Sequence, residues 1–233
     1  MASNQSLNIE RLRIIANALL PIKNKIVFVG GAVVSLYADD LSKEDVRITD
    51  DIDVVVEVIS RGDYSDIEEQ IRSLGFKNDI DSNVICRYKF LGITVDIMPN
   101  EEGILGFSNK WYIEGVKNSI DFSLDQETSI QIFPVAYFIS SKLEALKSVR
   151  HGKDYRWNSD FEDIIYIFNN CTKISESILQ SDKPVKEFVK FELEKLLRRP
   201  NIEEEIIAHL EYSSQQFRKN RIISIWKHQI TEI

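Results

Sequence analysis

The sequence predicts an α+β protein, in which a mixed β-sheet flanked by helices is followed by a helical C-terminal part. Two observations carry this prediction. Short runs rich in β-branched residues alternate with helical patterns as far as Pro134. From Asp160 onward, apolar residues recur almost only at helical spacing. We therefore expect an α/β core over residues 1–134 and a helical domain over residues 135–233.

The elements of the first part follow from local patterns. Apolar residues on one helical face predict the first helix, and an apolar strand then runs into the turn Gly30-Gly31. Gly75 stands where a C-terminal helix cap belongs. The predicted elements are a helix over 7–20, a strand over 26–29, a helix from the glycine turn to 37, a strand over 51–59 and a helix over 63–75.

The remaining elements are predicted in the same way. Two strands meet near Leu91 and Gly92, and Pro99 closes the second of them. A strand over 128–133 precedes Pro134, which suits an early position of the next helix. The later helices are predicted over 160–170, 183–199, 201–214 and 217–230.

Composition limits the class of protein. The chain has 233 residues, of which 43% are hydrophobic and 28% charged, as in ordinary globular proteins. No apolar run approaches the roughly 20 residues of a membrane span, so we expect no membrane partner. Charged residues interrupt the first apolar stretch, and the two cysteines lie far apart. The expected location is therefore the cytoplasm, with reduced thiols.

The charge of the chain bears on nucleic-acid binding. A net charge of −8 argues against a general nucleic-acid coating protein, because such binding depends on Lys and Arg. One stretch, Lys142 to Trp157, is locally basic, with five basic and two acidic residues. The acidic balance of the chain does not exclude such a local basic patch, which is where phosphates would lie if the chain binds a nucleic acid.

Three aspartates are the candidate metal ligands. Asp51 and Asp53 lie two apart in a strand and therefore point to the same face of the sheet. Asp96 lies in another β-branched strand, between Val95 and Ile97. Carboxylates arranged in this way suit Mg²⁺, which prefers oxygen ligands and keeps sites open for substrate phosphates. The ordinary alternatives are a strand-initiating turn for the pair and a backbone cap for Asp96.

The glycine turn is a candidate phosphate site. Gly30 and Gly31 lie between a strand and a helix, where backbone without side chains can approach a phosphate and N–H groups point toward it. A tight strand-to-helix connection is the simpler explanation. The combination of this turn, an Asp-x-Asp strand and a later solitary Asp strand favours the phosphate role.

These motifs resemble the nucleotidyltransferase fold of the DNA polymerase β superfamily. The pattern consists of Gly30-Gly31, the motif from Arg47 to Asp53, Asp96, Lys142 in "SSKLEAL" and the stretch "SDFEDI". The AbiEii-type toxin nucleotidyltransferases of bacterial type IV toxin-antitoxin systems are the nearest likeness. The nineteen residues between Gly31 and Asp51, which include the polar stretch "DDLSKED", exceed the family's usual connection.

The resemblance implies a role for each matching residue. Gly30 and Gly31 would hold the triphosphate, and Asp51 and Asp53 would bind two Mg²⁺ ions. Asp96 would be the third ligand or the base for the acceptor hydroxyl. The other implied nucleotide-binding residues are Arg47, Thr49, Lys142, Asp160 and Asp163. From the residues alone, Arg47 and Thr49 either orient the aspartate pair or flank it in solvent, and the last three fit ordinary helix positions equally well.

The implied activity is Mg²⁺-dependent transfer of a nucleoside monophosphate from a nucleoside triphosphate to an acceptor hydroxyl. A tRNA 3′ end would be the acceptor of a toxin-like enzyme, and a cognate antitoxin its protein partner. Two alternatives stay open. One is a nucleotidyltransferase that modifies a small molecule such as an antibiotic. The other is a catalytically degenerate nucleotide-binding module.

Overall fold

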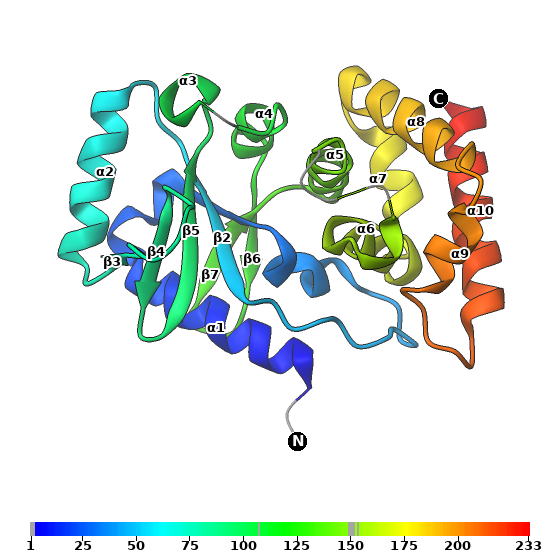
Figure 1. Ribbon diagram of the computed structural model, residues 1–233, viewed down its shortest axis with the longest axis horizontal. Coiled ribbons are helices and arrows are strands. Elements are labelled where there is room, and N and C mark those ends of the chain that lie inside the picture. Colours follow the sequence, from blue (N-terminus) through cyan, green and yellow to red (C-terminus); the bar gives the residue numbers. More distant parts are fainter. Residues whose placement is uncertain (1–2, 107, 149–151, 153) are drawn as a thin grey trace. The chain divides into compact units, whose positions relative to one another are not determined.

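A computed structural model describes residues 1–233 except residues 1–2, 107, 149–151 and 153 (Figure 1). The chain divides into two compact units. Unit 1 comprises Met1–Val33 and Asp45–Pro134, and unit 2 comprises Val34–Glu44 and Val135–Ile233. A short segment from within the first part of the sequence therefore belongs to the second unit.

Unit 1 is built on a seven-stranded mixed sheet within the described residues. Its order is β3-β4-β5-β2-β1-β7-β6. Strand β2 is antiparallel to β1 and parallel to β5, and β1 is parallel to β7. The strands are β1 Ile26–Val29, β2 Asp51–Val56, β3 Lys77–Asn78, β4 Arg87–Phe90, β5 Ile93–Pro99, β6 Ile120–Ser123 and β7 Ser129–Ile132.

Helices flank this sheet. Helix α1 begins after Ser3, whose hydroxyl accepts a hydrogen bond from the Ser6 amide. Helix α2 is capped in the same way by Ser60, and its Tyr64 hydroxyl donates to the Ile97 carbonyl of β5 at 3.0 Å. The helical elements of unit 1 are α1 Asn4–Ala18, α2 Arg61–Ser73, α3 Glu102–Leu105, α4 Tyr112–Lys117 and the 3₁₀ segment η1 Leu20–Lys25.

Unit 2 is helical. Helix α5 is buried along most of its length, and α6 buries Phe161 and Phe168, the latter in edge-to-face contact with Trp226 of α10. The helices are α5 Val135–Ala145, α6 Ser159–Asn170, α7 Ile174–Gln180, α8 Lys183–Leu197, α9 Ile202–Ile207 and α10 Gln215–Glu232, with the 3₁₀ turn η4 Tyr155–Trp157.

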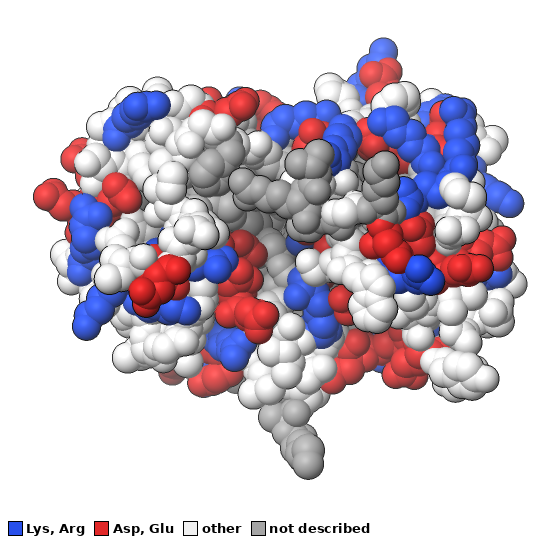
Figure 2. All heavy atoms as spheres, in the orientation of Figure 1, with Lys and Arg blue, Asp and Glu red and all other residues white. Residues whose placement is uncertain are grey.

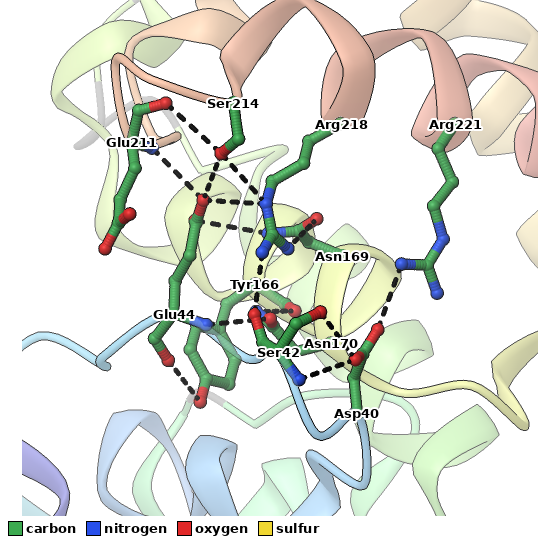
Figure 3. A network of polar contacts seen from close by, with 10 residues as sticks. All are labelled: Asp40, Ser42, Glu44, Tyr166, Asn169, Asn170, Glu211, Ser214, Arg218 and Arg221. Atoms are coloured by element: carbon green, nitrogen blue, oxygen red, sulfur yellow. Dashed lines mark hydrogen bonds and ion pairs between the residues drawn. The ribbon is translucent and has the colours of Figure 1, made fainter.

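Polar contacts hold the segment Val34–Glu44 against the helices of unit 2 (Figure 3). Glu44 Oε1 lies 3.0 Å from Arg218 Nε, and the two side chains are only 9% and 12% exposed. Arg218 also donates to the Ser42 carbonyl at 2.7 Å, and Arg221 pairs with Asp40 at 3.1 Å. Residues 39–44 of the polar stretch "DDLSKED" thus contribute contacts within unit 2, and its last residue, Asp45, belongs to unit 1.

The predicted fold class is confirmed. A mixed sheet flanked by helices comes first, and helices dominate the C-terminal part. Three of the predicted elements differ most in extent or type. The segment after the glycine turn is the 3₁₀ helix η2 Gly31–Tyr37, the strand predicted over 51–59 stops at Val56, and the helix predicted over 201–214 is limited to α9. No helix in the described part of the chain is both long and apolar enough to cross a bilayer.

Candidate metal centre

The sheet register brings the three predicted aspartates together. Asp53 of β2 lies directly opposite Asp96 of β5 in the parallel pair. Asp51 precedes Asp53 by two residues and therefore faces the same side of the sheet. Ile52, between them, points to the other side and is fully buried. The apolar half of β2 thus fixes the strand while its polar half presents two carboxylates.

The geometry of these carboxylates suits a cation. One oxygen from each of Asp51, Asp53 and Asp96 lies within 4.8 Å of the others. Asp96 is buried, at 7% exposure, and the other two are half-buried. Burial and the neighbouring Asp96 charge raise the pKa of Asp51, against the opposing effect of nearby arginines. A divalent ion with oxygen ligands would relieve this repulsion, so the donor set fits a hard cation such as Mg²⁺.

An arginine lies within the same cluster. Arg87 of β4 donates from Nε and NH2 to the two carboxylate oxygens of Asp96, both at 2.7 Å. The same NH2 group donates to Asp51 Oδ2 at 3.0 Å. These hydrogen bonds and charges raise the pKa of Arg87 further above its ordinary value. The carboxylate triad is therefore already associated with one positive charge from the protein.

The glycine turn closes one side of the triad. Gly30 follows β1 with a φ of +73°, which favours glycine. A Cβ atom at Gly30 would lie 1.8 Å from Asp53 Oδ2 and 2.8 Å from Asp53 Cβ. A Cβ atom at Gly31 would lie 2.4 Å from the Arg47 guanidinium. Gly30 therefore requires glycine, because the Asp53 side chain passes directly over its backbone, and a side chain at Gly31 would require Arg47 and Thr49 to shift.

The segment that carries Arg47 and Thr49 is held by helix α1. Asn8 of α1 is fully buried, donates to the Arg47 carbonyl at 2.9 Å and accepts from the Thr49 amide at 3.3 Å. Arg11, one turn further along α1, donates to the Thr49 carbonyl. Thr49 is itself only 1% exposed. Its methyl group packs toward Gly31, so it supports the turn while Arg47 supplies the charge beside it.

Lys142, Asp160 and Asp163 form a separate cluster in unit 2. Lys142 Nζ lies 2.8 Å from Asp160 Oδ1 and 2.7 Å from Asp163 Oδ2, and both Lys142 and Asp163 are buried. Burial alone would lower the pKa of Lys142, but the charges of the two aspartates raise it well above its ordinary value. The structure thus joins these three predicted residues in a buried ion network that ties α5 to α6.

The basic stretch predicted over Lys142 to Trp157 is largely engaged in internal pairs. Besides Lys142, Lys147 contacts Glu144 and Glu192, and Arg156 contacts Asp154 at 2.7 Å. Arg150 and Lys153 lie outside the described residues. Figure 2 shows Lys and Arg side chains gathered over α8. Two ion pairs of this helix, Lys183 with Glu187 and Arg198 with Glu194, place acidic side chains among them. Exposed positive charge in this part of unit 2 is therefore mixed with negative charge.

Two residues of the site, Arg87 and Asn8, were not predicted from the sequence. Arg87 could have been predicted from the position of a turn. The two-residue turn at Leu91 and Gly92 places residues at equal distances from it opposite each other, so Arg87 faces Asp96. No such signal exists for Asn8, because its contacts join residues about 40 positions apart.

The fold is similar to that of a known structure. A crystal structure described as an antigenic nucleotidyltransferase-like protein from Paracoccidioides brasiliensis superposes with a TM-score of 0.52. The match covers 89% of this chain and 95% of that chain, at 13% sequence identity. No protein-family model matches the sequence, and no curated protein is detectably similar to it. The chain therefore has a nucleotidyltransferase-like fold.

Proposed function

We propose that this chain is a Mg²⁺-dependent nucleotidyltransferase that moves a nucleoside monophosphate from a nucleoside triphosphate to an acceptor hydroxyl. One observation carries the proposal. Three carboxylates meet beside a glycine turn in which Gly30 has no room for a side chain, on a nucleotidyltransferase-like fold. Charge clusters of this kind are costly without a cation, and phosphoryl transfer uses such cations.

Each residue near the turn has a part in this reaction. Asp51 and Asp53 would bind the Mg²⁺ ions, with Asp96 as third ligand or as the acceptor of the hydroxyl proton. Gly30 and Gly31 would allow phosphate oxygens to reach the backbone, and the Arg47 guanidinium beside Gly31 would pair with them. Bound Mg²⁺ would neutralise charge on the triphosphate. The acceptor oxygen then forms a bond to the α-phosphorus as the bond to pyrophosphate breaks.

Lys142, Asp160 and Asp163 have a different part in our proposal. Their mutual pairing within unit 2 supports a structural role for the network. Direct binding of nucleotide phosphates by Lys142 would require it to leave two aspartates. We therefore propose that the nucleotidyltransferase core, residues 1–134, carries the metal and triphosphate contacts, and that the helical domain, residues 135–233, serves the acceptor.

The acceptor we propose is a tRNA 3′ end, in a toxin-like enzyme controlled by a cognate antitoxin. The resemblance of the motifs to the AbiEii-type toxins supports this choice. RNA binding should weaken as salt rises, because contacts to phosphates release counterions. The engagement of Lys142, Lys147 and Arg156 in internal pairs gives less support to their stretch as the RNA surface. Transfer to a small molecule such as an antibiotic is the second outcome of the test below.

The test is a labelling experiment. The full chain is incubated with Mg²⁺, each α-³²P nucleoside triphosphate in turn, and total cellular RNA, total protein or hydroxyl-bearing small molecules. We expect label in RNA, together with release of pyrophosphate. Label in a small molecule would show that the acceptor is a small molecule and not tRNA. Binding of the triphosphate without transfer would indicate a catalytically degenerate nucleotide-binding module.

A pair of variants tests the role of the triad in this experiment. Asp53→Ala removes one carboxylate from the triad and should abolish transfer while the fold is retained. Asp50→Ala removes the same charge three positions earlier, from an exposed residue outside the triad, and should leave transfer unchanged. Transfer by Asp53→Ala at the wild-type rate would contradict the proposed function.

A further inference from the structure

Arg87 is the one residue of the acidic cluster to which neither the predicted motifs nor the proposed reaction gives a role. Its guanidinium engages both oxygens of Asp96 and one oxygen of Asp51. Each of these oxygens belongs to a carboxylate that a metal would need. The side chain of Arg87 is 25% exposed and that of Asp96 10%, so water screens this pair only partly.

The fold holds Arg87 in this position. Its strand, β4, pairs with β5 through a two-residue turn, in which Leu91 and Gly92 both have positive φ. The two neighbours of Arg87, Cys86 and Tyr88, are almost completely buried on the opposite face. Arg87 therefore cannot shift along the strand without exposing them, and the contact with Asp96 is a fixed feature of the sheet.

Charge counting shows what Arg87 does to the site. The three carboxylates carry three negative charges when ionised, and Arg87 reduces the local sum by one. It also occupies acceptor oxygens by charge-assisted hydrogen bonds, which are stronger than neutral ones. A divalent cation approaching the triad therefore meets less negative charge and fewer available oxygens than the three aspartates alone would offer.

We propose that Arg87 is a resident cation of the triad, which holds Asp51 and Asp96 in the metal-free chain and competes with the divalent ion for their oxygens. This inference rests on the proposed function, since it assumes that the triad binds a divalent ion. Arg87 is then a positioning residue that sets metal affinity. A merely structural cross-strand pair would affect stability and leave metal affinity unchanged.

The test measures Mn²⁺ binding by isothermal titration calorimetry on the full chain. Arg87→Met removes the competing charge, and Mn²⁺ should then bind about tenfold more tightly. Lys89→Met is the matched control, because Lys89 lies two residues along the same strand and contacts Thr94 and Asp79 rather than the triad. Its Mn²⁺ affinity should stay within about twofold of wild type.

A second measurement covers the metal-free chain. Without metal, Arg87→Met should unfold at a lower denaturant concentration than Lys89→Met. Added Mn²⁺ should raise the unfolding midpoint of Arg87→Met more than that of Lys89→Met. If Arg87→Met does not fold, Arg87→Lys keeps one charge but loses the planar fork, and it should bind Mn²⁺ a few times more tightly than wild type.

The outcomes separate this inference from the proposed function. If wild type binds Mn²⁺ and the Arg87 variants bind it equally or more weakly, the competition is refuted and the nucleotidyltransferase proposal stands. If neither wild type nor any variant binds Mn²⁺, the proposed function fails and the role of Arg87 fails with it.

Discussion

Replacing Gly30 by alanine should damage both the stability of the chain and its metal site. The φ of +73° at Gly30 costs an L-residue about 1–2 kcal/mol. The added Cβ would also lie 1.8 Å from Asp53 Oδ2 and 2.8 Å from Asp53 Cβ. Rotation of the Asp53 side chain relieves the first contact but not the second, so the strand or the turn must move.

The expected size of the effect follows from these two terms. Crowding of this kind adds about 1–3 kcal/mol to the backbone strain, so Gly30→Ala should lower the free energy of unfolding by about 2–5 kcal/mol. Gly92→Ala is the matched control, because its φ is +82° and nothing lies within 4 Å of an added Cβ. Gly92→Ala should lower the free energy of unfolding only by the backbone strain, about 1–2 kcal/mol.

Two assays check this prediction. Urea denaturation compares the stabilities of the two variants, and calorimetry compares their Mn²⁺ affinities. Displacement of Asp53 should weaken Mn²⁺ binding by Gly30→Ala roughly tenfold or more, while Gly92→Ala binds as wild type does. Equal stabilities, or an unchanged Mn²⁺ affinity in Gly30→Ala, would refute the close approach of Asp53 to the turn.

Three further predictions concern unit 2. Lys142→Met leaves the buried Asp163 and the partly buried Asp160 without their cation and should destabilise the chain by about 3–5 kcal/mol in urea denaturation. Arg218→Met should lower the free energy of unfolding by about 3 kcal/mol, because the side chain of its partner Glu44 is only 9% exposed. Lys183→Met is the control for both variants, because the Lys183 side chain is 82% exposed, and it should lower that free energy by less than about 0.5 kcal/mol. Similar losses in all three variants would contradict the buried networks. The pKa of Asp40 is lowered from 3.8 to about 2, chiefly by hydrogen bonds from Ser42, so its stabilising effect is present above about pH 4 and is lost as pH falls through 2. The difference in unfolding free energy between wild type and Asp40→Asn should therefore shrink between pH 5 and pH 2, and a constant difference over that range would exclude this shift.

The parts of the site that could be predicted from the sequence are those encoded locally. Strand alternation places Asp51 and Asp53 on one face, and a glycine pair between strand and helix marks a close approach of backbone. The symmetry of the hairpin would also have predicted that Arg87 lies opposite Asp96, because the two residues are equally distant from the turn. Local sequence patterns thus predict contacts between strands that a two-residue turn connects.

The parts that could not be predicted depend on contacts between distant segments. Lys142 follows the pattern of an ordinary helix residue, and only the packing of α5 against α6 shows that it is buried between two aspartates. In the same way, the stretch "DDLSKED" has the composition of a solvent-exposed loop. The place of its residues 39–44 in unit 2 depends on Arg218, which lies 176 positions after Ser42. No local pattern carries that information.

The membership of Val34–Glu44 in unit 2 has a consequence for synthesis of the chain on the ribosome. Ser42 is made early, but the Arg218 side chain that donates a hydrogen bond to its carbonyl follows 176 residues later. At about 5–20 residues per second, the nascent segment waits roughly 10–35 s for its partner. During that interval the early segment has no α10 to bind. Unit 2 therefore completes its folding only after α10 has left the exit tunnel, however early the sheet of unit 1 forms.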